Sequence, residues 1–101
     1  MEQNAVCLSG LLRELKAVRT SPAGILHREL VLEHRSRQML DGQSREVRAL
    51  VTVKVTGREL TGKVESLQSG DRIVVSGLLA QVSHYDTQQL LIHAQAIERI
   101  E

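Results

Sequence analysis

The chain has 101 residues, 42% of them hydrophobic and 25% charged, a composition typical of a folded protein with one core rather than of a disordered segment. We therefore expect one domain that spans residues 1–101. Thirteen basic and twelve acidic side chains give a formal net charge of +1. This balance excludes a histone-like surplus of positive charge, so nucleic-acid binding would need a local group of arginines and lysines. One tyrosine and no phenylalanine or tryptophan leave few rings on which a base could stack.

The N-terminus and the cysteine content bear on the cellular compartment. The single cysteine, Cys7, cannot form a disulfide within the chain, which suits a reducing environment. No basic segment followed by an apolar run marks a signal peptide, and no stretch approaches the roughly 20 apolar residues of a membrane-spanning helix. These features predict a soluble, cytoplasmic protein with no membrane partner.

The first third of the chain predicts two strands joined by a turn. Residues 5–18 are rich in Val, Leu and Ala, and Gly10 divides them into two apolar runs, which indicates a bulge or a sharp bend. Pro22 and Gly24 favour a turn, because proline fixes φ and glycine accepts positive φ. The segment Ile25–Arg35 follows as a second strand, and its many charged residues mean that one face meets water or a partner.

The clearest predicted strand is Val47–Val55, in which valines alternate with other side chains. The polar segment Ser36–Arg45 precedes it and carries a hairpin-turn signal at Asp41 and Gly42. Side chains on a strand alternate between its two faces, so the valines point to the core. The outward face then carries Arg48, Leu50, Thr52 and Lys54.

The second half of the chain predicts a crossover and two more strands. Residues 58–67 have apolar side chains at helical spacing, which indicates a short helix or an irregular crossover. Residues 71–82 form the fourth predicted strand, which Gly77 interrupts, and residues 89–100 form the fifth after a polar loop at 83–88. Five strands in this order match the all-β, five-stranded Greek-key barrel called the OB-fold.

Four segments of the sequence give a more specific indication. They are Ser21–Ile25, Leu30–Ser36, Gly70–Gly77 and Leu91–Glu98. In these segments the chain resembles the primosomal replication protein N (PriB) family, small OB-fold dimers of bacterial replication restart. The Leu-Glu-His-Arg-Ser sequence after a Ser-Pro-x-Gly turn is the specific part. The Gly-Asp-Arg-Ile-x-Val-x-Gly piece is also similar to the fourth strand of single-stranded DNA-binding proteins.

The resemblance implies a homodimer in which the first strands pair across a two-fold axis. It implies that single-stranded DNA binds across the sheet face, without catalysis. It also implies contact with the restart helicase PriA, transfer to the next primosome protein DnaT, and exchange with the single-stranded DNA-binding protein. Relatives carry aromatic residues at positions that match Gln43 and Arg48, and a lysine-rich loop where residues 83–88 hold no lysine. We therefore expect weaker DNA binding than in those relatives.

The predicted DNA contacts lie mainly on two neighbouring strands. Arg48 and Lys54 are on the outward face, where cations can follow a DNA backbone and arginine can also stack on a base. Arg28 and His34 share one face of the preceding strand, and Arg35 points to the other face unless the strand twists. The alternatives are an ordinary solvated strand face for Arg48 and Lys54, and local scaffolding for His34 and Arg35.

Tyr85, at the tip of the last predicted loop, is the sixth predicted DNA contact. A base stacked on its ring would contribute to binding, and the alternative is a ring folded back over the barrel mouth. The predicted dimer interface is the first strand, because apolar side chains on both faces of a long strand suit an interface as well as a core. Its members are Val6, Leu8, Leu11 and Leu12.

The sequence carries no pattern typical of an enzyme. The chain has four histidines, at positions His27, His34, His84 and His93. Their spacing, with or without Cys7, does not match a metal-binding motif. Neither a Gly-x-Ser-x-Gly motif nor a phosphate-binding loop is present. We therefore predict no metal, no cofactor and no catalytic activity.

The sequence as a whole predicts a single-stranded DNA-binding accessory protein of the replication-restart primosome. In this role it stimulates the restart helicase and helps to assemble the next component. The near-neutral charge and the missing aromatic residues leave an alternative, an OB-fold protein-interaction module with weak or lost DNA binding. RNA binding is a further alternative, because stacking on a sheet is largely blind to the sugar.

Overall fold

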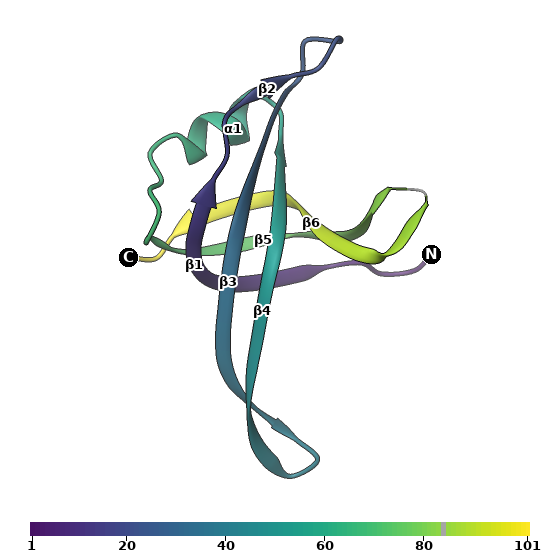
Figure 1. The fold of residues 1–101 in the computed structure, drawn as a ribbon, viewed down its shortest axis with the longest axis vertical. Coiled ribbons are helices and arrows are strands. Elements are labelled where there is room, and N and C mark those ends of the chain that lie inside the picture. Colours follow the sequence, from purple (N-terminus) through teal and green to yellow (C-terminus); the bar gives the residue numbers. More distant parts are fainter. Residues whose placement is uncertain (84) are drawn as a thin grey trace.

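The computed structural model describes residues 1–83 and 85–101. Figure 1 shows long, curved strands and one short helix among these residues. In chain order the elements are β1 (Val6–Leu15), β2 (Arg19–Thr20), β3 (Leu26–Leu40), β4 (Gln43–Thr56), α1 (Arg58–Val64), β5 (Arg72–Ser83) and β6 (Asp86–Arg99). No helix in this part of the chain is long and apolar enough to cross a membrane.

Five of the strands close into a barrel. The order is β1-β5-β6-β4-β3, and β3 pairs with β1 to complete the ring. The β4–β6 pairing is parallel and the other pairings are antiparallel. The short strand β2 adds to the edge of β3 at Leu26 and His27. This is the topology of the Greek-key barrel, so the all-β, OB-fold prediction is confirmed.

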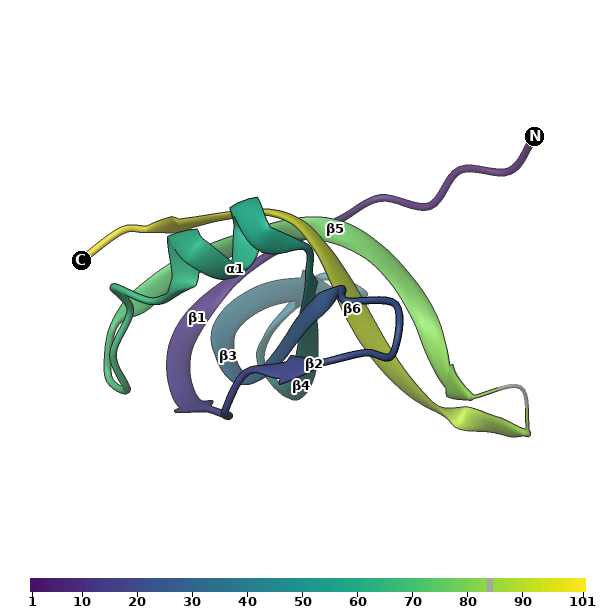
Figure 2. The same cartoon turned by 90° about the horizontal axis from the view of Figure 1, so that it is seen from above.

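The core is built from aliphatic side chains of every barrel strand and of α1. The fully buried members are Leu12, Leu30, Leu32, Val53, Val55, Val64, Ile73, Val75 and Ile92. The predicted alternation along β4 is confirmed, since Val53 and Val55 point inward while Leu50 is 66% exposed. Helix α1, which the sequence left open as a helix or a crossover, lies against β6 (Figure 2) and inserts Val64 into the core.

Two glycines let strands approach each other closely where the barrel bends. A Cβ atom on Gly10 would overlap the carbonyl oxygen of Glu33, and one on Gly77 would overlap that of His93. The pairing register of β5 shifts between Ser76 and Gly77, as predicted for a bend in that strand. In β1 the register shifts between Leu12 and Glu14 rather than at Gly10. Pairing with β5 is regular at Gly10, so of the two predicted alternatives, a bulge or a sharp bend, the bulge does not form there, and Gly10 serves close packing.

Both predicted turns form. In the first, the amide of Gly24 donates to the carbonyl of Ser21 at 2.8 Å, and Gly24 has a φ of 83°. In the second, Asp41 and Gly42 have φ values of 52° and 73°, as a two-residue type I′ turn requires. Such a turn brings its flanking residues into direct pairing, so Leu40 lies opposite Gln43. The polar segment 36–45 is thus strand on both sides of this turn.

The β3–β4 hairpin extends beyond the barrel as a two-stranded ribbon, at the bottom of Figure 1. The strand β1 pairs with β3 only as far as Glu33, and β6 pairs with β4 only from Thr52. The residues beyond these points, 34–40 and 43–51, form what we call the ribbon. The β5–β6 hairpin projects in a different direction, as Figures 1 and 2 show.

Candidate nucleic-acid interface

The outer face of β3 and β4 is defined by the residues that alternate with the core. Leu30 and Leu32 point inward, so the odd-numbered residues of β3 point outward. In the register of the pair, Arg35 lies opposite Arg48, and Lys54 lies opposite Glu29. The structure therefore places three of the predicted contacts, Arg35, Arg48 and Lys54, on one continuous face.

At the base of the ribbon, two of these arginines share a carboxylate. The same oxygen, Oε1 of Glu46, lies 2.9 Å from Nη2 of Arg35 and 3.1 Å from Nε of Arg48. The hydrogen bond from Arg35, and then that from Arg48, lowers the pKa of the Glu46 carboxyl. In turn, the hydrogen bond and charge of Glu46 raise the pKa of Arg35. We call this group the Arg35–Glu46–Arg48 cluster.

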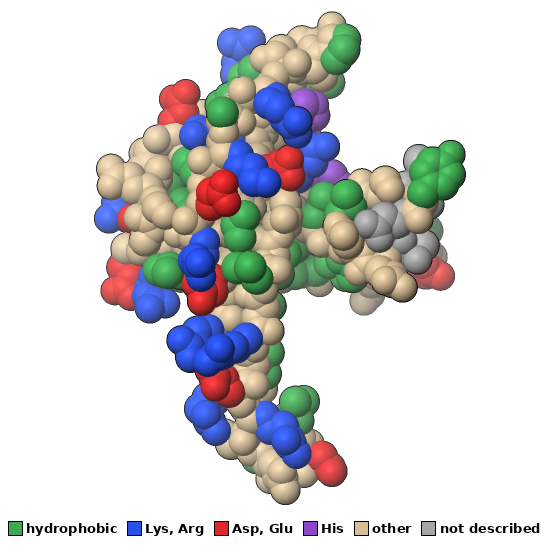
Figure 3. Space-filling view, viewed as in Figure 1, with side chains coloured by type: hydrophobic (Ala, Val, Ile, Leu, Met, Phe, Trp, Pro, Cys, Tyr) green, Lys and Arg blue, Asp and Glu red, His purple; other side chains and the backbone are tan. Residues whose placement is uncertain are grey.

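Other arginines of the same face are also paired with acids. Nη1 of Arg13 on β1 lies 2.8 Å from Oε2 of Glu33, and the hydrogen bond between them lowers the pKa of the glutamate. Nη2 of Arg19 on β2 lies 3.1 Å from Oε2 of Glu29. Figure 3 shows the result, a line of arginine and lysine side chains along β3 and β4 with acidic side chains set between them.

Two other predicted contacts, Arg28 and His34, lie on the inward side of β3. They alternate with the outer face, as the sequence predicted, and they make local hydrogen bonds. Nε of Arg28 donates to the carbonyl of Lys16 at 2.8 Å. Nδ1 of His34 lies 2.7 Å from the carbonyl oxygen of Ser9, and its Nε2 lies 2.8 Å from the hydroxyl of Ser36. These contacts favour the scaffolding alternative for His34, and they tie Arg28 to the backbone of Lys16.

Tyr85, the sixth predicted contact, lies at the turn between β5 and β6 and is 98% exposed. Its ring is therefore available to a base and does not fold back over the barrel. It stands on a different hairpin from the Arg35–Glu46–Arg48 cluster, so a strand of DNA that used both would have to pass between the two hairpins.

The residues predicted for the dimer interface divide between the two faces of β1. Leu12 has no exposed surface and belongs to the core, so its assignment to the interface is wrong. Val6 and Leu8 are partly buried and pack against the same core. Leu11 lies opposite Glu33, on the outer face, where a partner could reach it. Period-two alternation explains this division, because only every second side chain of a barrel strand points outward.

Comparisons with known proteins identify the family to which this chain belongs. A sequence profile described as "Another single-strand binding protein family" matches residues 4–96. The "Replication restart protein PriB" of Photorhabdus laumondii is 35% identical over 102 residues, which cover 100% of this chain and 97% of that protein. The chain belongs to the PriB family of OB-fold proteins.

Solved structures agree with the fold. The PriB protein of Ralstonia solanacearum superimposes with a TM-score of 0.86 at 20% sequence identity and covers 99% of this chain and 100% of its own. The single-stranded DNA binding protein of Thermus aquaticus gives a TM-score of 0.78 at 27% identity, over 98% of this chain and 50% of its own. The resemblance read from the sequence is thus confirmed.

Sequence reasoning missed two further arginines of the ribbon, Arg37 and Arg45. Arg37 lies opposite Glu46 on the outer face, and its Nε donates to the hydroxyl of Ser44 at 3.3 Å. Arg45 lies on the other face, with Nη2 2.9 Å from Oε1 of Gln43. The Asp41-Gly42 signal could have found them, because a two-residue turn predicts that the strands run right up to it.

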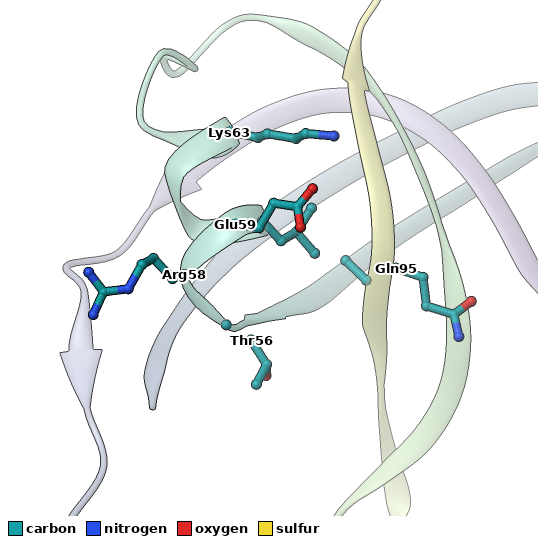
Figure 4. A pocket seen from close by; sticks show the side chains of 8 residues that line it. Thr56, Arg58, Glu59, Lys63 and Gln95 are labelled. Atoms are coloured by element: carbon teal, nitrogen blue, oxygen red, sulfur yellow. The ribbon is translucent and has the colours of Figure 1, made fainter. Parts of the chain in front are cut away.

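The described residues outside this face form no second candidate site. A hollow of about 470 Å³ lies between α1 and β6, with Lys63 and Glu59 pointing toward β6 and Arg58 pointing away (Figure 4). It contains no predicted site residue and mixes both signs of charge. Among the described residues, no three His, Cys, Asp or Glu side chains are grouped as metal ligands. His84 lies outside the described residues.

Proposed function

We propose that this protein binds single-stranded DNA without sequence preference, as an accessory factor in replication restart. The observation that carries the proposal is the exposed outer face of β3 and β4, on which Arg35 and Arg48 are direct cross-strand neighbours and Arg37 extends the series. Arginines so spaced can follow a phosphate backbone and release its counterions. Membership of the PriB family supports the same function, since its members carry the name of replication restart proteins.

The affinity would be electrostatic in origin, with little stacking beyond Tyr85. Titration of fluorescein-labelled oligo-dT by anisotropy, repeated at several salt concentrations, tests this. We expect the logarithm of the binding constant to fall linearly with the logarithm of the salt concentration, by roughly 0.7 per phosphate contact. A binding constant that does not change with salt would contradict the proposal.

A pair of charge-matched double variants locates the site. Arg35→Ala with Arg48→Ala removes two cations from the outer face, and we expect weaker binding and a salt slope lower by roughly 1.4, which is two contacts. The control, Arg58→Ala with Arg99→Ala, removes two cations from α1 and the end of β6 and should leave the slope unchanged. Equal losses in the two double variants would place the site elsewhere.

The proposal includes a homodimer formed through β1. Among the described residues, Val6–Gly10 pair with β5 on one edge, while ladder pairing with β3 begins only at Leu11 on the other edge. On that second edge the Ser9 carbonyl accepts from His34, and the backbone groups that lack a ladder partner can pair with another strand. Leu11 lies next to this stretch. Sedimentation should give about twice the chain mass of 11.2 kDa. Leu11→Arg should shift the protein toward a monomer, and a wild-type monomer would contradict the dimer.

The proposal also includes the partners that the sequence resemblance implies: the restart helicase PriA, DnaT and the single-stranded DNA-binding protein. A second candidate function is a protein-interaction module with little DNA binding. Leu50, 66% exposed on the outer face of β4, favours it, because an apolar side chain there suits a protein partner. If the Arg35→Ala, Arg48→Ala variant loses DNA but still stimulates unwinding by the helicase, the interaction is the primary activity.

A further inference from the structure

We propose that Glu46 is a built-in competitor for DNA, whose carboxylate occupies the phosphate position that Arg35 and Arg48 form. The inference rests on the proposed function and adds to it a residue that limits affinity. Glu46 then holds the protein in a weak-binding state, from which a phosphate must displace its side chain.

The geometry of the free protein is that of an occupied anion site. Arg35 and Arg48 lie directly opposite each other on adjacent strands, an arrangement in which like charges repel. One oxygen of Glu46 sits between them, 2.9 Å from one guanidinium and 3.1 Å from the other. The carboxylate therefore offsets the repulsion and fixes the two guanidinium groups around a single acceptor.

A phosphodiester oxygen is an acceptor of the same kind. Guanidinium N–H groups bind carboxylates and phosphates through the same charge-assisted hydrogen bonds. The N–H groups that Glu46 accepts from, at Nη2 of Arg35 and Nε of Arg48, cannot point at a phosphate at the same time in this geometry. Binding of DNA at this place and retention of the Glu46 contacts thus exclude each other.

Exposure makes the displacement feasible. The side chains of Arg35, Arg48 and Glu46 are 57%, 66% and 41% exposed, so solvent and salt screen their attraction. No core residue depends on the cluster, which stands on the ribbon beyond the pairing of β1. The carboxylate can leave without disturbing the barrel.

Glu46 also differs from the other acids of this face. Glu29 and Glu33 pair with Arg19 and Arg13, which are outside the predicted set of DNA contacts. Of the ion pairs among the described residues, those of Glu46 are the ones that engage predicted contacts. Glu33 acts on Arg35 and Arg48 through its charge, whereas Glu46 hydrogen-bonds to both, so the competitor role belongs to Glu46.

The test is the affinity of Glu46→Gln for fluorescein-labelled oligo-dT at low salt. We expect binding about three- to tenfold tighter than wild type, because the amide keeps the size of the side chain but not its charge. Glu46→Ala should tighten binding as well. The control, Glu65→Gln, makes the same change of net charge at an exposed residue just after α1 and should change the affinity less than twofold.

A double-variant cycle separates competition from a general change in charge. If Glu46 acts through its two arginines, Glu46→Gln should have no effect when Arg35→Ala and Arg48→Ala are also present. A gain that persists in that background, or equals that of Glu65→Gln, overturns the inference. A loss of affinity in Glu46→Gln or Glu46→Ala would overturn it too, since it would make Glu46 an organiser of the arginines.

The two proposals fail in different ways. If oligo-dT binding by the wild type ignores salt, or survives Arg35→Ala with Arg48→Ala unchanged, the proposed DNA site is wrong. If wild-type binding falls with salt and Arg35→Ala with Arg48→Ala weakens it, but Glu46→Gln binds no tighter than the control, the DNA site stands and only the competitor role is wrong.

Discussion

His34 joins β3 to the carbonyl oxygen of Ser9 on β1, at a distance of 2.7 Å from its Nδ1. Ladder pairing between these strands ends one residue earlier, at Glu33. Because a carbonyl only accepts, Nδ1 donates and the hydroxyl of Ser36 donates to Nε2 in the neutral ring. The imidazole thus continues the connection between the strands by a side chain, at the point where the ribbon leaves the barrel.

We expect His34→Ala to reduce the free energy of unfolding by about 1–2 kcal/mol, the net worth of two ordinary hydrogen bonds. Amide hydrogen exchange in the ribbon should accelerate, while that of the core strands changes less. His27→Ala is a suitable control, since its hydrogen bond to Thr56 is 3.4 Å long; it should cost less than about 0.5 kcal/mol. Equal costs by chemical denaturation would contradict this role of His34.

Gly77→Ala should destabilise the protein severely. A Cβ at this position meets the backbone carbonyl of His93, and backbone cannot move aside as a flexible side chain can. We expect a loss of about 3 kcal/mol or more, or no folded protein. Gly62→Ala, in α1 where a Cβ meets nothing, should instead stabilise by about 0.5–1 kcal/mol. Thermal unfolding followed by circular dichroism distinguishes the two, and a folded, unchanged Gly77→Ala would disprove the close contact.

Tyr85→Ala should weaken oligo-dT binding by about fivefold or more if a base stacks on the ring. Tyr85→Phe keeps the ring and should bind like wild type. Because the side chain is 98% exposed, neither change should alter stability, which a denaturation curve checks. Equal affinity of the alanine and phenylalanine variants would remove Tyr85 from the DNA path.

Lowering the pH should weaken the Arg35–Glu46–Arg48 cluster, because Glu46 becomes protonated. The pKa of Glu46 is below the ordinary value of 4.5. The cluster's contribution to stability is therefore complete above that ordinary value and is lost as the pH falls through the lowered pKa. We expect Glu46→Gln to lose less thermal stability than wild type between about pH 6 and about pH 3. Parallel acid curves for the two proteins would show that the cluster does not contribute.

The sequence predicted the barrel well, because each barrel strand has one buried face and one face exposed to solvent. Period-two alternation found Val53 and Val55, and turn chemistry found Asp41 and Gly42. It was incomplete in the ribbon at residues 34–40 and 43–51, where the strands extend beyond the barrel and most side chains are exposed, so the turn marks how far they run. The pairing of Glu46 with two arginines could not be predicted either, because it depends on cross-strand register.

The barrel also constrains how the chain reaches its native state. The first strand pairs with β5, so that Val6 meets Gly77, and most of the sequence must be present before this pairing can form. Contacts between residues so distant along the chain slow folding, to milliseconds or seconds in proteins dominated by them. Until β5 arrives, the edge of β1 that β5 covers, at residues 6–11, is open, and newly made chains are then most exposed to association through this strand.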